Sequence, residues 1–304
     1  MTLLAVVGPT ASGKSDVAMP LAEERGADIV SVDSMQVYRG MDIGTAKPDV
    51  GQRARVRHHL LDLVEPEAEF TVADYQAAGV DVLDRLATAG CPAILVGGSG
   101  LHFRSLVDPI HPAPTDPELR AELEAASVDE LVAELRRHDP HAGAAVDLAN
   151  PRRVVRAVEV LRLTGATPTQ RAGATPDVAG YRSVRPFVAV GLDPGDSLAS
   201  LVERRLQAMV DGGFLDEVGR LRHRLGRTAR QAVGYRQLLA VVDGTTSVED
   251  GLAAARRATV ALARRQRTFF RRDPRIRWVP WHDDISVRVD KSRALLDGEP
   301  AWTS

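Results

Sequence analysis

The stretch GPTASGKS at residues 8–15 combines two glycines, a lysine and a hydroxyl at the spacing G-x-x-x-x-G-K-[ST]. Such a loop surrounds phosphate oxygens with backbone N–H groups when a strand precedes it and a helix follows. Lys14 adds a point charge, and the Ser15 hydroxyl can reach Mg²⁺. A glycine turn that only joins a strand to a helix would leave these two residues unexplained. We therefore predict a diphosphate site formed by Gly8, Pro9, Thr10, Ala11, Ser12, Gly13, Lys14 and Ser15.

A carboxylate ends the second apolar run, DIVSVD, at Asp33. In nucleotide kinases and NTPases an aspartate in this context holds a metal ion. A carboxylate at the end of a strand can also take a proton as a general base. The phosphate loop does not decide between these roles, because its N–H groups recognise diphosphate oxygens whether the molecule is ATP, GTP or another diphosphate.

The composition is that of an ordinary globular protein, with 44% hydrophobic and 26% charged residues among 304. The single cysteine, Cys91, precludes an internal disulfide and fits a reducing cytoplasm. No apolar run reaches the roughly 20 residues that span a bilayer, and the first residues carry no basic signal-peptide region. The net charge is −2, but only three of the 39 basic residues are lysine, and two of these, Lys14 and Lys47, fall in motifs. We expect a cytoplasmic, monomeric protein.

Strand and helix patterns alternate over the first hundred residues, which predicts a mostly parallel α/β sheet flanked by helices. The expected strands are residues 3–7, 27–33, 92–98 and 185–192. The expected helices are residues 15–26 and 71–90, the second opened by a threonine cap and closed by glycine. Because ligands gather at the carboxyl ends of parallel strands, Gly8, Asp33 and Gly97–Gly98 are expected to face one crevice.

A proline-rich stretch at residues 108–117 separates this α/β pattern from a purely helical one. We predict an α/β core of residues 1–112 and 183–304 and an all-helical insertion of residues 113–182. Within the insertion, residues 167–180 are expected to form a loop. The remainder of the core is predicted as helices over residues 198–214, 234–244 and 248–272.

A long stretch after Asp33 is far more specific than the phosphate loop. Together with GPTASGKS, the sequence DSMQVY–GMDIGTAKP (33–48) closely resembles the tRNA dimethylallyltransferases (tRNA isopentenyltransferases). The resemblance continues in order through HHLLDLVEP (58–66), TVADYQ (71–76), LVGGSGLHF (95–103), NPRRVVRAVEV (150–160), VGYRQ (233–237) and RRQRTFFRR (264–272). It covers nearly the whole chain and implies a P-loop NTPase-like core. No Cys/His zinc finger is present near the end of the sequence, and this absence matches the bacterial rather than the eukaryotic members of the family.

The resemblance implies that the chain transfers a dimethylallyl group from dimethylallyl diphosphate to N6 of adenosine 37 of tRNA, with Mg²⁺ as cofactor. In that family Asp33 would be the base that takes the amine proton, although a metal-ligand role stays open. Thr10, Lys14 and an arginine would stabilise the departing diphosphate. We place this arginine at Arg205, with the adjacent Arg204 as the other possibility. Ser15 would bind the metal.

By the same resemblance a set of residues would contact the anticodon region of tRNA. These are Asp33, Ser34, Met35, Gln36, Ser99, Arg120, Arg152, Arg153, Arg156, Gln231, Gly234, Tyr235 and Arg236.

Seven arginines between residues 256 and 272 are opposed in sequence only by Asp273, and they suit phosphate contacts or a solvated face equally. Phe269 and Phe270 are expected in the core. His58 and His59 are expected to be structural or close to tRNA and not metal ligands.

Three other functions remain possible from the residues alone. An adenylate isopentenyltransferase would prenylate AMP or ATP, a P-loop kinase would phosphorylate a metabolite, and a nucleotide switch would hydrolyse GTP or ATP. A free nucleotide does not need the helical insertion or the arginine-rich tail, and no N-K-x-D base-reading motif of GTPases occurs. These features favour a transferase that acts on tRNA over the three alternatives.

Overall fold

The computed structural model describes residues 3–173 and 180–298. The chain divides into two compact units, one formed by Met1–Asp108 with Ser183–Ser304 and the other by Pro109–Arg182. The first boundary lies between residues 108 and 109, four residues before the predicted position, and the second lies between residues 182 and 183, at the predicted position.

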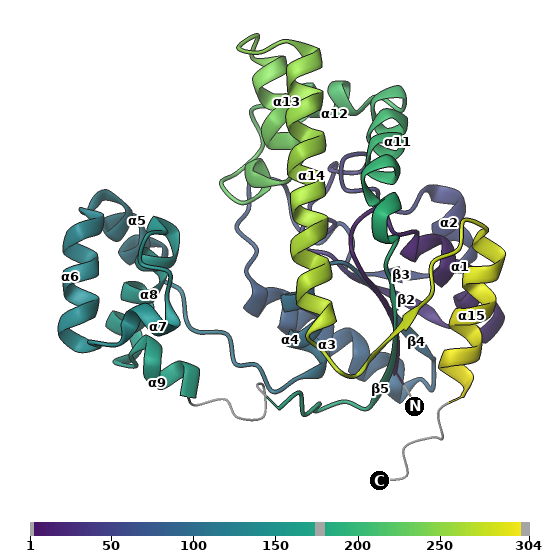
Figure 1. The fold of residues 1–304 in the computed structure, drawn as a ribbon, viewed down its shortest axis with the longest axis horizontal. Helices are drawn as coiled ribbons and strands as arrows, with labels where there is room; N and C mark the ends of the chain where they lie inside the picture. Colours follow the sequence, from purple (N-terminus) through teal and green to yellow (C-terminus); the bar gives the residue numbers. More distant parts are fainter. Residues whose placement is uncertain (1–2, 174–179, 299–304) are drawn as a thin grey trace. The chain divides into compact units, whose positions relative to one another are not determined.

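The first unit contains a six-stranded sheet in the order β3-β2-β4-β1-β5-β6 in which every pair is parallel (Figure 1). The strands are β1 (Leu3–Val7), β2 (Asp28–Val32), β3 (His58–His59), β4 (Ala93–Gly97), β5 (Phe187–Leu192) and β6 (Ile276–Val279). Four of them were predicted. The other two escape the sequence pattern because β3 has only two residues, both histidine, and β6 alternates with arginine in a basic stretch.

The three strands that carry the chemical motifs are neighbours in the sheet. Val7 of β1 pairs with Gly97 of β4, and Val32 of β2 pairs with the same glycine from the other side. The residues that follow these strands, Gly8, Asp33 and Gly98, therefore meet at one edge, as the sequence predicts.

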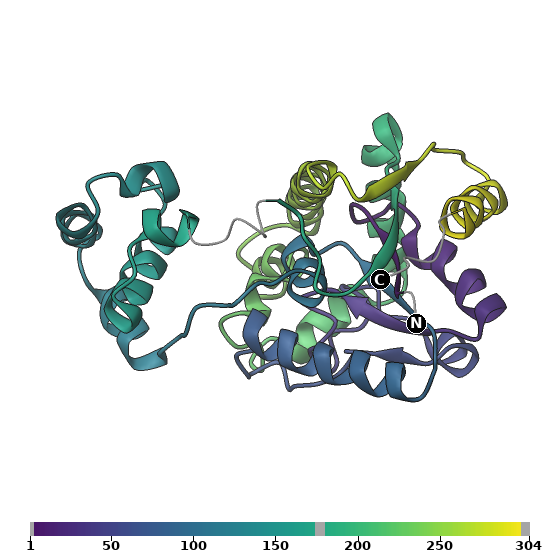
Figure 2. The same ribbon diagram turned by 90° about the horizontal axis from the view of Figure 1, so that it is seen from below.

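Each face of the sheet is covered by helices (Figure 2). On one face, Leu3, Ala5 and Val7 share a core with α3 (Val72–Thr88) and α4 (Gly100–Val107). On the other face, Val6 packs with α1 (Lys14–Arg25) and α15 (Ile285–Asp297). This alternation along β1 is what a central strand buried on both faces requires. The N-terminal boundary of α3 follows from a capping box between Thr71 and Asp74.

The remaining helices of this unit include α11–α14, which rise beyond the carboxyl ends of the strands (Figure 1). These helices and the neighbouring short ones are α2 (Val50–Arg55), η1 (Gly195–Ser197), α11 (Leu198–Asp211), α12 (Phe214–Leu221), η2 (Ala229–Gln231), α13 (Tyr235–Val242) and α14 (Val248–Arg271). The buried carboxylate of Glu217 in α12 accepts the backbone N–H groups of Asp42, Ile43 and Gly44 at 2.8–3.0 Å and the Tyr235 hydroxyl. This network fixes the loop after β2 against α12 and α13.

The second unit is all-helical. Its helices are α5 (Pro117–Ala125), α6 (Val128–His138), α7 (Ala142–Ala145), α8 (Pro151–Thr164) and α9 (Pro168–Gly173). Leu131, Leu135, Val154 and Val158 belong to a core of its own. The core also contains the buried carboxylate of Glu159, which binds Arg120 and Arg156 and accepts the N–H of Asp116.

The expectation of a loop over residues 167–180 is wrong for its first part, where α9 forms. Thr167 and Gln170 cap this helix, since each accepts the backbone N–H of the other, at 3.3 and 2.9 Å. The spacing T-x-x-Q is a capping-box signal, but Pro168 within it and Pro176 after it favour a loop when the sequence is considered alone. Residues 174–179 lie outside the described part of the chain.

The glycine at the end of β4 yields a stability prediction. A Cβ at Gly97 would lie 2.0 Å from the Val32 carbonyl oxygen, so Gly97→Ala must separate β2 from β4. We expect a loss of about 2 kcal/mol or more in the free energy of unfolding, measured by urea denaturation. Gly219→Ala, on the exposed side of α12 with nothing within 4 Å, is the control and should change the stability by about 1 kcal/mol or less. Equal effects of the two substitutions would contradict this packing.

Candidate active site

The phosphate loop joins β1 to α1, and its two glycines have no room for a side chain. Gly8 has φ +145°, and a Cβ there would lie 2.2 Å from the Leu192 carbonyl oxygen. Gly13 has φ +75° and would place a Cβ 2.5 Å from Nη1 of Arg288. The loop is thus shaped by its neighbours, and the N-terminus of α1 faces the larger of two cavities described below.

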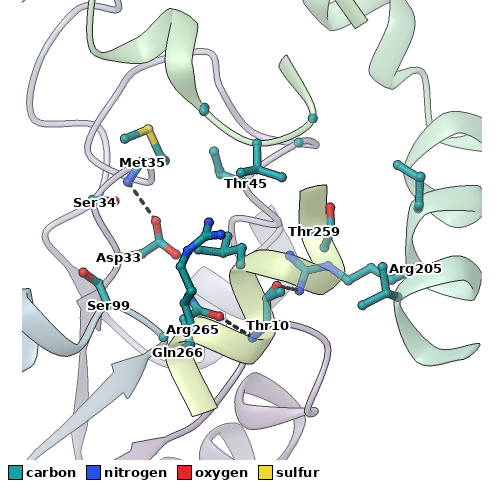
Figure 3. A pocket seen from close by; sticks show the side chains of 18 of the residues that line it. Thr10, Asp33, Ser34, Met35, Thr45, Ser99, Arg205, Thr259, Arg265 and Gln266 are labelled. Carbon is teal, nitrogen blue, oxygen red and sulfur yellow. Dashed lines mark hydrogen bonds between the residues drawn. The ribbon is translucent and has the colours of Figure 1, made fainter. Parts of the chain in front are cut away.

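Thr10 is contacted by two side chains from distant helices (Figure 3). Nη1 of Arg205, on α11, donates to the Thr10 hydroxyl at 2.6 Å. Oε1 of Gln266, on α14, accepts the Thr10 backbone N–H at 2.8 Å. Arg204 is exposed, whereas Arg205 is partly buried, so the arginine that reaches the phosphate loop is Arg205.

Lys14 lies inside the loop, where Nζ donates to the Pro9 carbonyl oxygen at 2.6 Å. Burial, and after it the Arg205 guanidinium, lower the pKa of Lys14 to about 7, while Asp33 and Asp16 act in the opposite direction. A cation in this position is therefore costly until an anion arrives to compensate it.

Asp33 follows β2 directly, and its Oδ1 accepts the backbone N–H of Met35 at 2.8 Å (Figure 3). This bond fixes the carboxylate and leaves its second oxygen to act on a substrate. Asp33 lines both cavities, so it lies where two substrates could meet.

Two cavities open around this carboxylate. The first, of about 310 Å³, is lined by Ser34, Ser99 and Phe269 among others. The second, of about 910 Å³, is lined by residues 13–16 of the phosphate loop and α1 among others. The two share the residues Thr10, Asp33, Thr45, Gly98, Arg205, Met209 and Gln266. Such a pair suits a reaction between a diphosphate in the larger cavity and an acceptor in the smaller one.

The residues around Ser99 complete the smaller cavity. The Ser99 hydroxyl and Nδ1 of His102 share a hydrogen bond of 2.7 Å, and burial lowers the pKa of His102, which keeps the imidazole neutral at pH 7. Phe269 lies against Gly100, where a Cβ would be 2.0 Å from its ring. Phe270 is buried as expected, but the expectation that Phe269 is a core residue is wrong, because it is 36% exposed and lines the cavity.

Comparison with known proteins places this geometry in a family. The model of a family described as IPP transferase matches residues 36–273. The chain belongs to this IPP transferase family.

Individual relatives extend the match beyond the family model. The chain is 42% identical over 305 residues to the tRNA dimethylallyltransferase of Bifidobacterium animalis subsp. lactis (strain AD011), which covers 97% of this chain and 86% of that protein. It is 45% identical over 305 residues to the tRNA dimethylallyltransferase of Parafrankia sp. (strain EAN1pec), covering 97% and 92%. The crystal structure of the full-length tRNA isopentenylpyrophosphate transferase from Bacillus halodurans is similar with a TM-score of 0.68 and 33% identity, over 98% of this chain and 97% of that chain. The predicted resemblance and α/β fold class are thereby confirmed.

Within this IPP transferase fold, the residues predicted to contact tRNA fall into different environments. Ser34, Met35, Ser99 and Gly234 line the smaller cavity. The Gln36 amide is engaged internally, since it accepts the Ser31 hydroxyl at 2.6 Å and donates to the carbonyl oxygens of Thr45 and Ala46 at 3.1 and 3.2 Å.

The stretch at residues 231–236 is divided in the same way. Gln231 and Arg236 are exposed. The Tyr235 side chain is completely buried and its hydroxyl donates to Glu217, so this side chain is not accessible to a ligand, and the predicted tRNA contact of this residue is left to its backbone. An aromatic residue beside a glycine turn resembles a base-stacking residue in sequence, but here it packs edge-on against Phe214, with ring centroids 5.0 Å apart.

The predicted arginines of the helical unit gather around α8. Arg152, Arg153 and Arg156, together with Arg171 of α9, line a groove of about 820 Å³ in this unit. Arg120 lies on α5 and binds Glu159 beside Arg156. Arg156 also donates to the Ala113 and Pro114 carbonyl oxygens at 2.8 and 2.9 Å, so its first role is structural.

The arginine-rich face of α14 has more opposing charge than the sequence suggests. Asp193, after β5, binds Arg267 at 2.7 Å and Arg271 at 2.8 Å. Glu203 of α11 lies 3.3 Å from Arg256. The expectation that Asp273 alone opposes these arginines is wrong because the other carboxylates come from elements distant in sequence.

Several residues that line the smaller cavity were not among the predicted site residues. These are Thr45, Thr259, Arg265, Gln266 and Phe269. Of these, Gln266 has the clearest signal in the sequence, because it is the one amide within a run of arginines. Only one face of such a helix can be exposed, so a residue that interrupts the run can face inward.

The described residues contain no group of three or more His, Cys, Asp or Glu side chains placed to hold a metal. His59 instead bonds to Asp28 at 2.7 Å, and His58 to the Val56 carbonyl oxygen at 2.8 Å. None of the described helices has the length and apolar character needed to span a membrane.

The environment of Lys14 generates a pH prediction. With the pKa lowered to about 7, the free protein should show one lysine Cε NMR signal that titrates near neutrality, and the signal should be absent from Lys14→Met. A bound pyrophosphate favours the ammonium form and should raise this pKa toward the ordinary lysine value of about 10.4. Binding then takes up a proton above pH 7. A Lys14 signal that titrates only above about pH 9 without ligand would contradict this environment.

Proposed function

We propose that this chain transfers the dimethylallyl group of dimethylallyl diphosphate to N6 of adenosine 37, next to the anticodon of tRNA. The observation that carries the proposal is the position of Asp33, which lines the cavity of the phosphate loop and the smaller cavity beside it. The relatives named tRNA dimethylallyltransferase support the same reaction.

In this reaction the N6 nitrogen attacks C1 of the allyl group, a C–N bond forms, and the C1–O bond to the diphosphate breaks. The exocyclic amine is a poor nucleophile because its lone pair is delocalised into the purine ring. It therefore needs a base to take its proton. Asp33 fits this task, since Oδ1 is fixed by the Met35 N–H and the other carboxylate oxygen remains to accept the proton.

The leaving pyrophosphate gains negative charge on the oxygen that separates from C1. The donors on that side are the loop N–H groups, the Lys14 ammonium and the pair formed by Thr10 and Arg205, whose 2.6 Å hydrogen bond fixes both side chains before substrate binds. Donors arranged in advance around developing charge lower a barrier by about 3–4 kcal/mol each.

The donor set fits Mg²⁺ as a partner of the diphosphate. The Ser15 side chain is exposed, lines the larger cavity and directly follows Lys14. Mg²⁺ in phosphate sites takes few protein ligands and completes its shell with phosphate oxygens and water. Ser15 would hold the ion, which neutralises charge on the diphosphate.

The smaller cavity offers both kinds of contact that an extruded adenosine requires. Ser34, Ser99 and Thr45 supply polar groups for the base, while Met35 and Phe269 supply apolar surface. Exposed Arg236 and the arginines of the groove in the helical unit would bind RNA phosphates. The enzyme would act as a monomer in the cytoplasm.

The decisive experiment is mass spectrometry of nucleosides after the protein is incubated with dimethylallyl diphosphate, Mg²⁺ and an unmodified anticodon stem-loop. We expect N6-dimethylallyladenosine at position 37 with wild-type protein. With Asp33→Asn, whose amide oxygen can still accept the Met35 N–H, we expect a rate about 10²–10⁴-fold lower with unchanged stem-loop affinity. If AMP were prenylated as fast as the stem-loop, the protein would instead be a nucleotide prenyltransferase. If Asp33→Asn kept full turnover, Asp33 would not be the base.

Two adjacent arginines of α11 provide a matched test of leaving-group stabilisation. Arg205→Ala removes the guanidinium bound to Thr10, and we expect kcat to fall about 10²–10³-fold. Arg204→Ala removes an exposed charge one residue away and should leave kcat within about twofold. The measurement is steady-state prenylation at saturating donor and stem-loop, and equal kcat values for the two variants would reject the role of Arg205.

A further inference from the structure

A buried arginine outside the residues matched by the family model lies against the phosphate loop. Arg288, in α15, is only 8% exposed. Its guanidinium stacks on the ring of Trp281 at 4.3 Å from the ring centroid, and Nη1 donates to the Ser12 carbonyl oxygen at 3.3 Å. A Cβ on Gly13 would lie 2.5 Å from the same Nη1, so no side chain separates the guanidinium from the loop.

This arginine has no carboxylate within ion-pair distance among the described residues, and its buried Nε has no hydrogen-bond partner. Two buried acids of the described part, by contrast, have arginine partners: Asp108 binds Arg104 and Arg275, and Asp193 binds Arg267 and Arg271. Burying a guanidinium without a counter-ion is unfavourable. The structure therefore maintains a positive charge whose partner is not part of the protein.

The cavity that this charge lines identifies the partner. Arg288 and Trp281 border the larger cavity together with Gly13, Lys14 and Ser15. Asp16, Asp283 and Asp284 are the carboxylates that act on Arg288, and they do so from beyond ion-pair distance. A ligand that neutralises the arginine from inside this cavity is an anion, and residues 13–15 of the phosphate loop line the same cavity.

We propose that Arg288 is a further diphosphate-binding residue, which contacts the terminal phosphate of the donor and is oriented by the face of Trp281. This inference rests on the proposed function, because it takes the donor diphosphate to lie in the larger cavity. Arg205 and Thr10 contact the loop from α11, and Arg288 contacts it from α15. The diphosphate is thus bound by side chains of two helices as well as by the loop itself.

The test compares Arg288→Met with Arg293→Met by titration calorimetry with pyrophosphate. Methionine keeps an apolar side chain against Trp281 and removes the charge. Arg293 lies on the same helix, where it is exposed to a greater extent and paired with Glu24 and Asp290, so it controls for the loss of one arginine. We expect pyrophosphate to bind Arg288→Met about 10- to 100-fold more weakly, and Arg293→Met as tightly as wild type.

Two further readouts separate ligand binding from a structural role. The melting temperature of Arg288→Met without ligand should equal or exceed that of wild type, because an uncompensated buried charge has been removed, while the upward shift caused by pyrophosphate should shrink. Dimethylallyl monophosphate, which lacks the terminal phosphate, should bind Arg288→Met and wild type equally.

The outcomes distinguish this inference from the function on which it rests. If wild-type protein binds no pyrophosphate, the donor site of the proposed function fails. If wild type binds it and Arg288→Met binds it equally well, or if the monophosphate loses affinity by the same factor, Arg288 does not contact the terminal phosphate and the transferase proposal stands unchanged.

Discussion

The constraint on which the site depends is the close approach of three strand ends to one another. Gly97 has no space for a Cβ because the Val32 carbonyl oxygen would lie 2.0 Å away, and a Cβ on Gly98 would lie 2.6 Å from the Gln266 amide and 3.3 Å from the Gly8 carbonyl oxygen. Gly8 is limited in the same way by the Leu192 carbonyl oxygen. Larger residues would push Asp33, the phosphate loop and α14 apart. The glycines therefore set the distance between Asp33 and the phosphate loop.

The electrostatics of the site follow from that convergence. The loop, α11 and α15 bring Lys14, Arg205 and Arg288 toward one cavity, and burial is the largest influence on the pKa of each, lowering all three. Asp33 opposes this for Lys14 and Arg205, and in the proposed reaction the same carboxylate accepts the proton of the amine. The free protein thus holds cations that are incompletely compensated, and a multiply charged diphosphate supplies the missing charge. Buried cations of this kind contribute little to the stability of the free protein. Their expected role is therefore to bind such a ligand.

Local signals carried much of the sequence prediction, and non-local contacts account for the rest. The phosphate loop, four strands and the position of Asp33 follow from short patterns with a direct structural meaning. The choice of Arg205 over Arg204 depends on which side of α11 faces Thr10, and adjacent residues on a helix point about 100° apart. Phe269, Tyr235 and the carboxylate partners of the arginine run depend on elements distant in sequence, which no local pattern specifies. Strand β3 is too short to carry a pattern at all.

The stretch GMDIGTAKP, which contributes strongly to the family resemblance, acts mainly through its backbone. Three consecutive N–H groups of this stretch bind the buried Glu217 carboxylate, and Gly44 has no room for a Cβ beside Phe214 and Tyr235. Lys47 is not available to phosphate, because its ammonium binds Asp42 at 2.8 Å and Asp62 at 2.6 Å. Only Thr45 of these residues borders both cavities. A distinctive sequence motif beside an active site can therefore encode the shape of a loop, and the residues that perform the chemistry must be identified from the contacts they make.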